Sequence, residues 1–333
     1  MAARGLRCGT GRLCALEPMG PMAPARVLAR DTRSRQCGGA PATLRVKRLG
    51  VVGCGQMGTG IAIVAARHAG VEVLALDKFP GSLERSRQFV ADWAAKENKK
   101  GRLNDAEVPE LKERIQYGEL GDKKAMSAVA GLDFVIEAVS EDLAVKKAVF
   151  AELAEAGLRS DSILASNTSS ISITKLAAGT HRPEGFIGMH FMNPVPVMPL
   201  VEVIRGLRTD EDTLSQTLQL CTAMKKQHAT SEDRPGFVAN RILMPYINEA
   251  VGVLQEGTAT AEDIDKVMRL GTNVPMGPLT LADFIGLDTC LSIMQVLHRD
   301  LGDSKYRPAP LLMNYVEAGW LGKKTKRGFY SYE

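Results

Sequence analysis

Short apolar runs alternate with amphipathic stretches between residue 48 and residue 226. The apolar runs predict strands at 49–53, 71–76, 132–137, 163–166, 186–190 and 200–204. Apolar positions at helical spacing predict helices at 57–69, 83–99, 105–113, 143–156 and 211–226. Strands that alternate with helices are typical of a parallel sheet with crossover helices. We therefore predict the α/β class, with a doubly wound, Rossmann-like sheet domain.

The pattern changes at the segment Asp233-Arg234-Pro235-Gly236. Proline lacks an amide donor and glycine tolerates unusual backbone angles, so this segment is a good place for a domain boundary. Beyond it we expect only helices, at 237–255, 261–270, 279–285, 289–301 and 311–318. The sequence thus predicts a leader at 1–47, a sheet domain at 48–234 and an all-helical C-terminal domain at 235–333.

Charge is concentrated at the start of the chain. Residues 1–48 hold ten Lys or Arg against two acids, which leaves residues 49–333 at about −4 of the total of +4. A mildly acidic body argues against a nucleic-acid partner. The Arg-rich, acid-poor leader resembles a transit peptide for a mitochondrion or plastid. A disordered basic tail, or a start at Met19 or Met22 of a cytoplasmic protein, is the alternative.

Neither a membrane span nor a metal site is expected from the sequence. No run of eighteen apolar residues occurs, so we expect a soluble protein without membrane contact. Half of the six cysteines lie in the leader, and Cys54, Cys221 and Cys290 are far apart and show no metal-ligand spacing. We therefore expect a reduced body that holds no metal.

A glycine-rich motif follows the first predicted strand. Residues Gly53-Cys54-Gly55-Gln56-Met57-Gly58 form GxGxxG at the opening of a helix, where glycines allow a tight turn and a close approach to pyrophosphate. Asp77 ends the second strand, where a carboxylate accepts hydrogen bonds from ribose hydroxyls and repels the 2′-phosphate of NADP. The context predicts NAD as cofactor. Lys78, beside Asp77, is more simply a solvated lysine.

A carboxylate lies within the short apolar run 200–204. Burying Glu202 unpaired would be costly, so the residue should have a partner. His190 precedes it by twelve residues, with three prolines in the connection. If the two strands run antiparallel, His190 falls nearly opposite Glu202 and the pair can serve as a general base. From spacing alone, a structural histidine beside a surface glutamate is an equally good interpretation.

Four segments of the sequence form a characteristic set. They are Ser166-Asn167-Thr168-Ser169-Ser170, the HFMNPVPVM sequence at 190–198, Leu200-Val201-Glu202, and the PGFVANR sequence at 235–241. Together they resemble the L-3-hydroxyacyl-CoA dehydrogenase family. The resemblance runs in order from about residue 48 to residue 333 and is closest to free-standing members acting on short chains. It implies reversible, NAD-dependent oxidation of a 3-hydroxyacyl-CoA thioester to the 3-oxoacyl-CoA, in fatty-acid metabolism, by a homodimer.

The same resemblance implies roles for individual residues. His190 would be the catalytic base and Glu202 its partner, with Ser169 and Asn240 near the reacting oxygens of the substrate. Asn193 would lie beside substrate or nicotinamide. The residues implied to bind cofactor are Gly53, Gly55, Gln56, Met57, Gly58, Asp77, Glu141, Lys146, Asn167, Asn193 and Lys324.

A basic segment is expected to meet the acyl-CoA substrate. Residues 83–117 resemble the family's helical hairpin, which contacts coenzyme A, and Lys100 is the residue that we expect to meet its phosphates. Pro199 departs from the family, whose members commonly have a basic residue there.

Two other functions remain open at this point. Another two-domain NAD enzyme, acting on a free hydroxy acid, would share the fold. A non-catalytic NAD-binding homologue would be expected to lack a catalytic residue, whereas Ser169, His190, Glu202 and Asn240 are all present.

Overall fold

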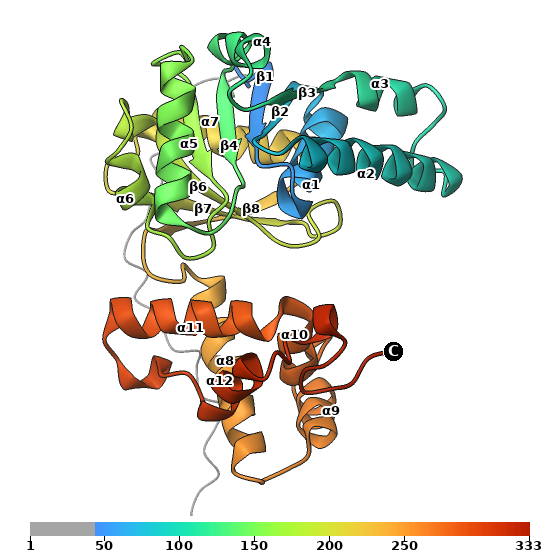
Figure 1. Cartoon of the computed structure of the whole chain (residues 1–333), viewed down its shortest axis with the longest axis vertical. Helices are drawn as coiled ribbons and strands as arrows, with labels where there is room; N and C mark the ends of the chain where they lie inside the picture. Colours follow the sequence, from blue (N-terminus) through green and yellow to red (C-terminus); the bar gives the residue numbers. More distant parts are fainter. Residues whose placement is uncertain (1–43) are drawn as a thin grey trace, which may run out of the picture. The chain divides into compact units, whose positions relative to one another are not determined.

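A computed structural model describes residues 44–333; the predicted leader lies almost wholly outside the described residues. Its sheet has eight strands in the order β3-β2-β1-β4-β5-β6-β7-β8 (Figure 1). Every neighbouring pair is parallel except β6 and β7, which are antiparallel. The predicted α/β class is confirmed. The strands are β1 Arg48–Val52, β2 Glu72–Asp77, β3 Ile115–Glu119, β4 Phe134–Glu137, β5 Ile163–Ser166, β6 Phe186–Phe191, β7 Leu200–Arg205 and β8 Gln227–Glu232.

Helices pack on both faces of this sheet because its strands are apolar on both sides. In β2, for example, Val73 and Ala75 join one hydrophobic core while Leu74 and Leu76 join the other. The first core includes residues of α1 Gln56–Val64, its π-helical extension Ala65–Ala69, α2 Pro80–Lys99, α3 Glu107–Glu113 and α7 Glu211–Ala223. The second includes residues of α4 Lys123–Ser127, α5 Leu143–Glu155 and α6 Ile173–Ala177.

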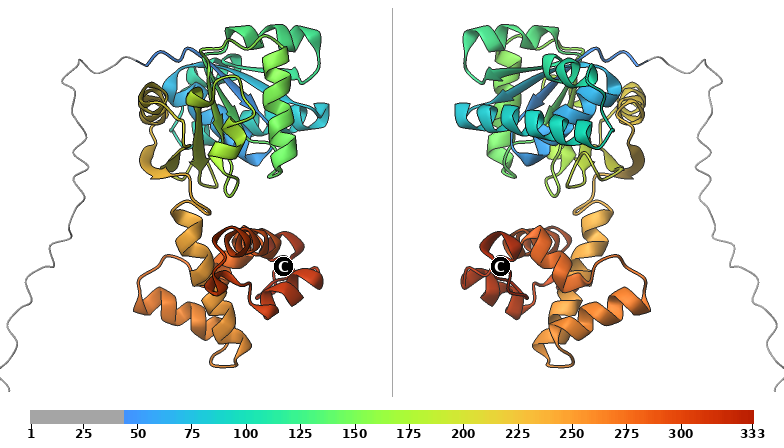
Figure 2. Two further views of the ribbon diagram at one scale, coloured as in Figure 1. Left: turned by 90° about the vertical axis from the view of Figure 1, so that its left-hand side faces the viewer. Right: turned by 90° about the vertical axis from the view of Figure 1, so that its right-hand side faces the viewer.

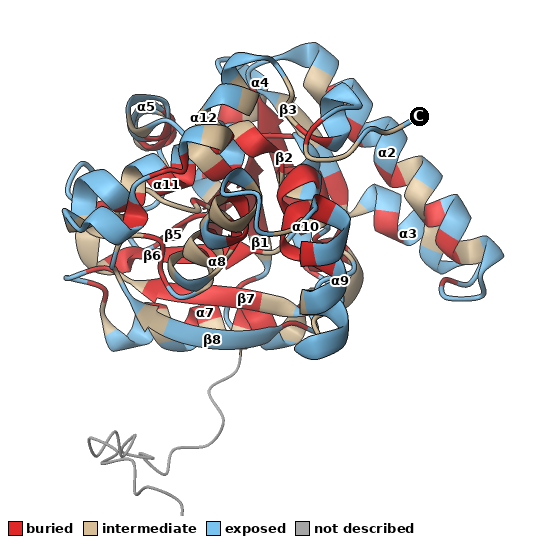
Figure 3. Ribbon diagram, turned by 90° about the horizontal axis from the view of Figure 1, so that it is seen from below, coloured by how far each residue is buried: buried red, intermediate tan, exposed pale blue. Residues whose placement is uncertain are grey.

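Both edge strands escaped the sequence analysis. The helix predicted at 211–226 ends at Ala223, and a new strand, β8, begins at Gln227 and pairs with β7. Its residues are almost all exposed, as Figure 3 shows in pale blue, so no apolar alternation marks it. At the other edge, β3 begins at Ile115, so the last three residues of the expected hairpin segment 83–117 belong to a strand. The helical hairpin itself ends at Glu113.

Beyond residue 238 the described chain is helical, as predicted. These helices, orange to red in Figure 2, surround a hydrophobic core of their own. They are α8 Ala239–Gln255, α9 Ala261–Gly271, α10 Pro278–Ile285, α11 Leu287–Leu301 and α12 Pro310–Glu317. Within residues 44–333, no single helix has the length and apolarity to cross a membrane; only α10 and α11, bent by 97°, meet the criterion as a pair.

The strand order reverses between β1 and β4. From β1 the chain continues outward to β2 and β3, and it then returns to β4 on the other side of β1. In doubly wound sheets, ligands bind at the carboxyl ends of the strands where this reversal occurs. Gly53 follows β1 and Ala138 follows β4, so the glycine motif lies at this crevice.

Candidate active site

The three motif glycines have different surroundings. Gly53 has a φ of 98°, and a Cβ there would lie 2.6 Å from the carbonyl oxygen of Ala138. A Cβ at Gly58 would overlap the carbonyl oxygen of Gly53. A Cβ at Gly55 would meet nothing within 4 Å. Two glycines are therefore needed for packing, whereas Gly55 opens the start of α1, where the first helical amides have no intrahelical acceptor. This cradle fits the pyrophosphate of a dinucleotide.

Gln56 and Met57, the other motif residues predicted to bind cofactor, are the first two residues of α1. Their amides thus belong to the unpaired first turn of the helix, beside the open face at Gly55.

Asp77 links the end of β2 to the glycine turn. Its Oδ2 accepts a hydrogen bond from the amide of Cys54 at 2.7 Å, and its Oδ1 accepts one from the amide of Phe79 at 2.8 Å. Each carboxylate oxygen can accept two hydrogen bonds, so both retain capacity for another donor such as a ribose hydroxyl. Lys78 is exposed.

His190 and Glu202 face each other across β6 and β7. The antiparallel register pairs the two residues, and His190 Nδ1 lies 2.7 Å from Glu202 Oε2. This contact confirms the predicted pairing. Because an ionised carboxylate can only accept, Nδ1 is the donor of this contact, and in the neutral ring the lone pair is then on Nε2. The arrangement therefore presents a basic ring nitrogen.

Glu202 is also held by the segment that opens α8. Its Oε1 accepts hydrogen bonds from the amides of Val238 and Ala239 at 3.2 and 3.0 Å. Burial raises the pKa of Glu202, but hydrogen bonds from His190 and the two amides outweigh it and leave the pKa below its ordinary value. Glu202 is therefore ionised at neutral pH, although it is buried.

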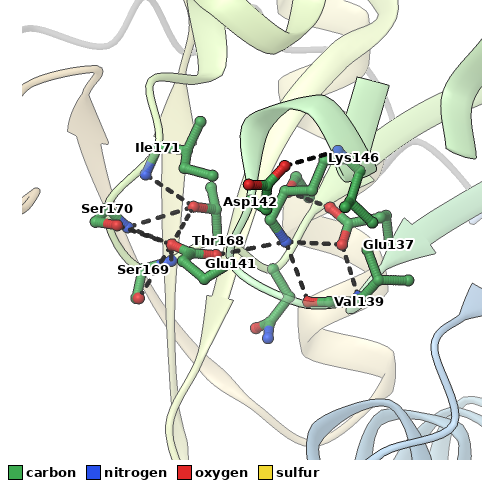
Figure 4. A network of polar contacts seen from close by, with 12 residues as sticks. Glu137, Val139, Glu141, Asp142, Lys146, Thr168, Ser169, Ser170 and Ile171 are labelled. Carbon is green, nitrogen blue, oxygen red and sulfur yellow. Dashed lines mark hydrogen bonds and ion pairs between the residues drawn. The ribbon is translucent and has the colours of Figure 1, made fainter. Parts of the chain in front are cut away.

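Ser169 and Asn240 meet beside a third carboxylate, Glu141. Asn240 Nδ2 donates a hydrogen bond to the carbonyl oxygen of Ser169 at 3.1 Å. Glu141 Oε1 accepts hydrogen bonds from Thr168 Oγ1 at 2.6 Å and from the amides of Ser169 and Ser170 at 2.9 Å (Figure 4). The hydroxyls of Ser169 and Ser170 lie 3.2 and 2.9 Å from the same oxygen, so five donors share its two lone pairs. Glu141 thus fixes the turn formed by residues 168–170.

Lys146 lies behind Glu141 and is completely buried. Its Nζ is 3.4 Å from Glu141 Oε2 and 2.7 Å from Oε1 of Glu137, whose carboxylate is buried (Figure 4). Burial raises the pKa of Glu141, but the Lys146 charge and the hydrogen bonds from residues 168–170 bring it below its ordinary value. The sequence analysis missed Glu137, although a carboxylate at the end of an apolar strand is the same signal that identified Asp77.

Two asparagines connect the strand ends. Asn167 Oδ1 accepts a hydrogen bond from the amide of Phe191 at 2.9 Å, which ties the end of β5 to the end of β6. Asn193 Oδ1 accepts one from Gln56 Nε2 at 3.0 Å. The glycine helix α1 is therefore joined to the segment that follows His190.

The structure joins neither Lys324 nor Lys100 to the residues above. Lys324 Nζ lies 2.6 Å from both carboxylate oxygens of Asp288, within the helical region. Lys100 Nζ lies 3.0 Å from Glu97 Oε1 at the end of α2. Their expected contacts with cofactor and coenzyme A remain predictions.

The cysteines of the described segment do not resemble nucleophiles. All three are free and buried, and burial raises the pKa of each thiol to about 12. Within residues 44–333, no group of His, Cys, Asp and Glu side chains is arranged to hold a metal ion.

The fold and the site define a nucleotide-dependent dehydrogenase with a helical second domain. The features that do so are the doubly wound sheet, the open glycine cradle and the buried histidine–carboxylate pair. Residues 48–234 match the 3-hydroxyacyl-CoA dehydrogenase NAD binding domain, and residues 236–332 match the C-terminal domain of the same enzymes. The chain belongs to the 3-hydroxyacyl-CoA dehydrogenase family.

Named relatives cover nearly the whole described chain. A 3-hydroxybutyryl-CoA dehydrogenase of Bradyrhizobium diazoefficiens is 52% identical over 288 residues, which are 86% of this chain and 96% of that protein. The hydroxyacyl-coenzyme A dehydrogenase, mitochondrial, of Rattus norvegicus is 38% identical over 290 residues, 86% of this chain and 92% of that protein. The crystal structure of a (S)-3-hydroxybutyryl-CoA dehydrogenase from Ralstonia eutropha has a TM-score of 0.82 at 44% identity, covering 86% of this chain and 99% of that one.

These matches confirm the predicted family, the enzyme class and the NAD cofactor. The protein is an NAD-dependent 3-hydroxyacyl-CoA dehydrogenase. The free hydroxy-acid dehydrogenase and the non-catalytic homologue are accordingly set aside.

Proposed function

We propose that this enzyme interconverts short-chain L-3-hydroxyacyl-CoA and 3-oxoacyl-CoA thioesters, with 3-hydroxybutyryl-CoA as its preferred substrate. The observation that carries the proposal is the buried His190–Glu202 pair, in which Nε2 is the basic ring nitrogen. The names of relatives 52% and 44% identical to this chain support the four-carbon substrate.

His190 is the general base of the proposed reaction. Nε2 takes the proton of the substrate's 3-hydroxyl group during oxidation and returns it during reduction. Glu202 holds the Nδ1 proton and stabilises the imidazolium that forms, because its carboxylate is ionised. The glycine cradle at residues 53–58 would hold NAD, which would supply the acceptor for the hydride. General-base catalysis of this kind contributes about 10²- to 10⁴-fold to the rate.

Ser169 and Asn240 orient the substrate's reacting oxygen in this proposal. The side chain of Asn240 is held at the 168–170 turn because it donates to the carbonyl oxygen of Ser169, and the hydroxyl of Ser169 is held there by Glu141. Hydroxyl and amide donors in such a position stabilise the negative charge that develops on the substrate's oxygen during the reaction. Asn193, linked to Gln56 of α1, is proposed to contact substrate or nicotinamide.

The remaining site residues are proposed to bind the cofactor or the coenzyme A. Asp77 would receive the adenosine ribose. Glu141 and Asn167 would line the nicotinamide end, and Lys146, which is completely buried, would act there through its contact with Glu141. Lys100 would meet coenzyme A phosphates, and Lys324 would exchange its partner Asp288 for the cofactor. We also propose domain limits at 48–234 and 235–333.

We further propose import into an organelle, directed by residues 1–47. Their charge supports it, with ten basic residues against two acidic ones up to residue 48. The mitochondrial label of the Rattus norvegicus relative adds support. Fusion of residues 1–48 to a fluorescent reporter should give a mitochondrial or plastid pattern, and a diffuse cytosolic pattern would refute the proposal.

Steady-state kinetics tests the proposed substrate. Oxidation of NADH should be fastest, by kcat/KM, with acetoacetyl-CoA, slower with longer 3-oxoacyl-CoAs and undetectable with free acetoacetate. A maximum at a longer acyl chain would contradict the short-chain assignment, and turnover of the free acid would contradict the thioester requirement.

A further inference from the structure

Glu137 lies at the ligand-binding crevice of the sheet but has no part in the proposed chemistry. It is the last residue of β4 and pairs in register with Val52 of β1 and Ser166 of β5. The next residue, Ala138, is the one whose carbonyl oxygen packs against Gly53. Glu137 thus lies where the strand order reverses, directly beneath the glycine turn.

Every oxygen of this carboxylate has a partner. Oε1 lies 2.7 Å from Lys146 Nζ and accepts a hydrogen bond from the amide of Val139 at 2.7 Å. Oε2 accepts one from the hydroxyl of Ser166 at 2.6 Å. Neither Glu137 nor Lys146 has any exposed side-chain surface. A buried charge of either residue would be strongly destabilising without the other.

Lys146 has a particular need for negative partners. It is the fourth residue of α5, near the end of the helix where the backbone dipole disfavours a cation. Two carboxylates are within reach, Glu137 at 2.7 Å and Glu141 at 3.4 Å. One ammonium group is therefore shared between them, and the shorter contact is the one to Glu137.

This sharing determines what Glu141 can hold. Because Lys146 lies closer to Glu137, Glu141 contacts it only through Oε2 and keeps Oε1 for the 168–170 turn. If Glu137 lost its charge, Lys146 would have Glu141 as its only anionic partner and would be drawn toward it. The hydrogen bonds that orient Ser169 would then weaken, and Asn240 would lose its fixed acceptor.

We propose that Glu137 is a positioning residue, which holds Lys146 back from Glu141 and thereby sets the placement of Ser169 and Asn240. The chain of contacts runs from Glu137 through Lys146 and Glu141 to the 168–170 turn (Figure 4). This inference rests on the proposed function insofar as Ser169 and Asn240 act on the substrate.

A double-mutant cycle between Glu137→Gln and Glu141→Gln tests the inference. Glutamine keeps the shape and the acceptor oxygen but removes the charge. Glu137→Gln should lower kcat with acetoacetyl-CoA about tenfold, since small displacements of orienting groups have effects of this size or larger. In the Glu141→Gln background the same change should have almost no further effect, because both act through one path. The dissociation constant of NADH, measured by fluorescence, should show the same non-additivity.

A matched control separates positioning from stability. Asp265 of α9 is another buried carboxylate, and it accepts hydrogen bonds from the amides of Leu279 and Thr280 at the start of α10. Asp265→Asn should lower the unfolding midpoint but leave kcat within about twofold, because this carboxylate has no contact with the site. If Glu137→Gln fails to fold, Glu137→Asp replaces it in the same cycle. Aspartate keeps the charge but, being shorter, moves it away from Lys146.

Additive losses in kcat and in NADH affinity, or a Glu137→Gln enzyme with normal turnover, would overturn the inference. The proposed function fails separately, if the wild-type enzyme does not turn over acetoacetyl-CoA. In that event the role of Glu137 is tested by the double-mutant cycle on the dissociation constant of NADH alone.

Discussion

Among single residues, Asp77 has both a structural role and a proposed role in binding the cofactor. Its carboxylate holds the amides of Cys54 and Phe79, and we propose that it also binds the ribose. Asp77→Ala should therefore raise KM for NAD and narrow the preference for NAD over NADP, by about tenfold for a lost charge-assisted contact. The measurement is the ratio of kcat/KM for the two cofactors. An unchanged ratio would mean that Asp77 only supports the turn.

Glu202 makes stability depend on pH. Its pKa in the folded protein is below its ordinary value of 4.5, so its ionisation stabilises the fold above that value. This contribution is lost as the pH falls through the lowered pKa. Glu202→Gln should cost about 1.5–3 kcal/mol at pH 7, the range for hydrogen bonds to charged groups, and less near pH 3. Urea unfolding at both values measures the gap; a gap that widens in acid would contradict this.

The sequence predicted some of these contacts and not others. The contact between His190 and Glu202 could be predicted for two reasons. A carboxylate in an apolar strand needs a partner, and an antiparallel pair of strands brings residue 190 opposite residue 202. The hydrogen bonds that Glu202 accepts from the amides of residues 238 and 239 could not be predicted, since they depend on how the chain turns into α8. The same holds for Lys146, whose two carboxylates come from β4 and the loop before α5.

At the scale of elements, apolar periodicity located the strands buried in the sheet and missed both edges. β8 is exposed along nearly its whole length and carries no alternation, so the sequence predicts helix up to residue 226, whereas α7 ends at Ala223. Lys226 is in fact buried and donates to the carbonyl oxygens of Val195 and Met198. Burial lowers the pKa of Lys226. Such a tertiary contact leaves no local pattern in the sequence.

The opening of α1 allows a matched pair of substitutions. Gly55 has φ −73° and ψ −170°, which alanine can adopt, and open space lies where its Cβ would be. Gly55→Ala should keep the unfolding midpoint but weaken NADH binding about tenfold, because the methyl group enters the pyrophosphate cradle. Gly58→Ala should instead destabilise the fold, because its Cβ would overlap Gly53. Equal effects of the two on stability would contradict this division of roles.

At the scale of the whole molecule, the helical region leaves apolar side chains exposed. Val267 and Leu270 of α9 are 64% and 72% exposed, and Ile242 of α8 and Phe284 of α10 are also exposed. We propose that a second copy of the chain covers them, as the family resemblance predicts.

Leu270→Glu should therefore increase the monomer fraction in sedimentation velocity by destabilising the dimer interface. Leu207→Glu is the control, because Leu207 is 87% exposed but belongs to the sheet domain. A monomeric wild-type enzyme, or an equal effect of both substitutions, would refute the proposed interface.

We propose that His190 and Glu202 act together as the proton-transfer pair. A double-mutant cycle on kcat, with acetoacetyl-CoA and NADH, tests it most directly. His190→Gln should lower kcat by about 10²- to 10⁴-fold with NADH affinity almost intact. Glu202→Gln should cost as much or less, and the double mutant should be little worse than His190→Gln, because the two residues form one unit. Fully additive losses, or near-normal turnover by His190→Gln, would contradict the account.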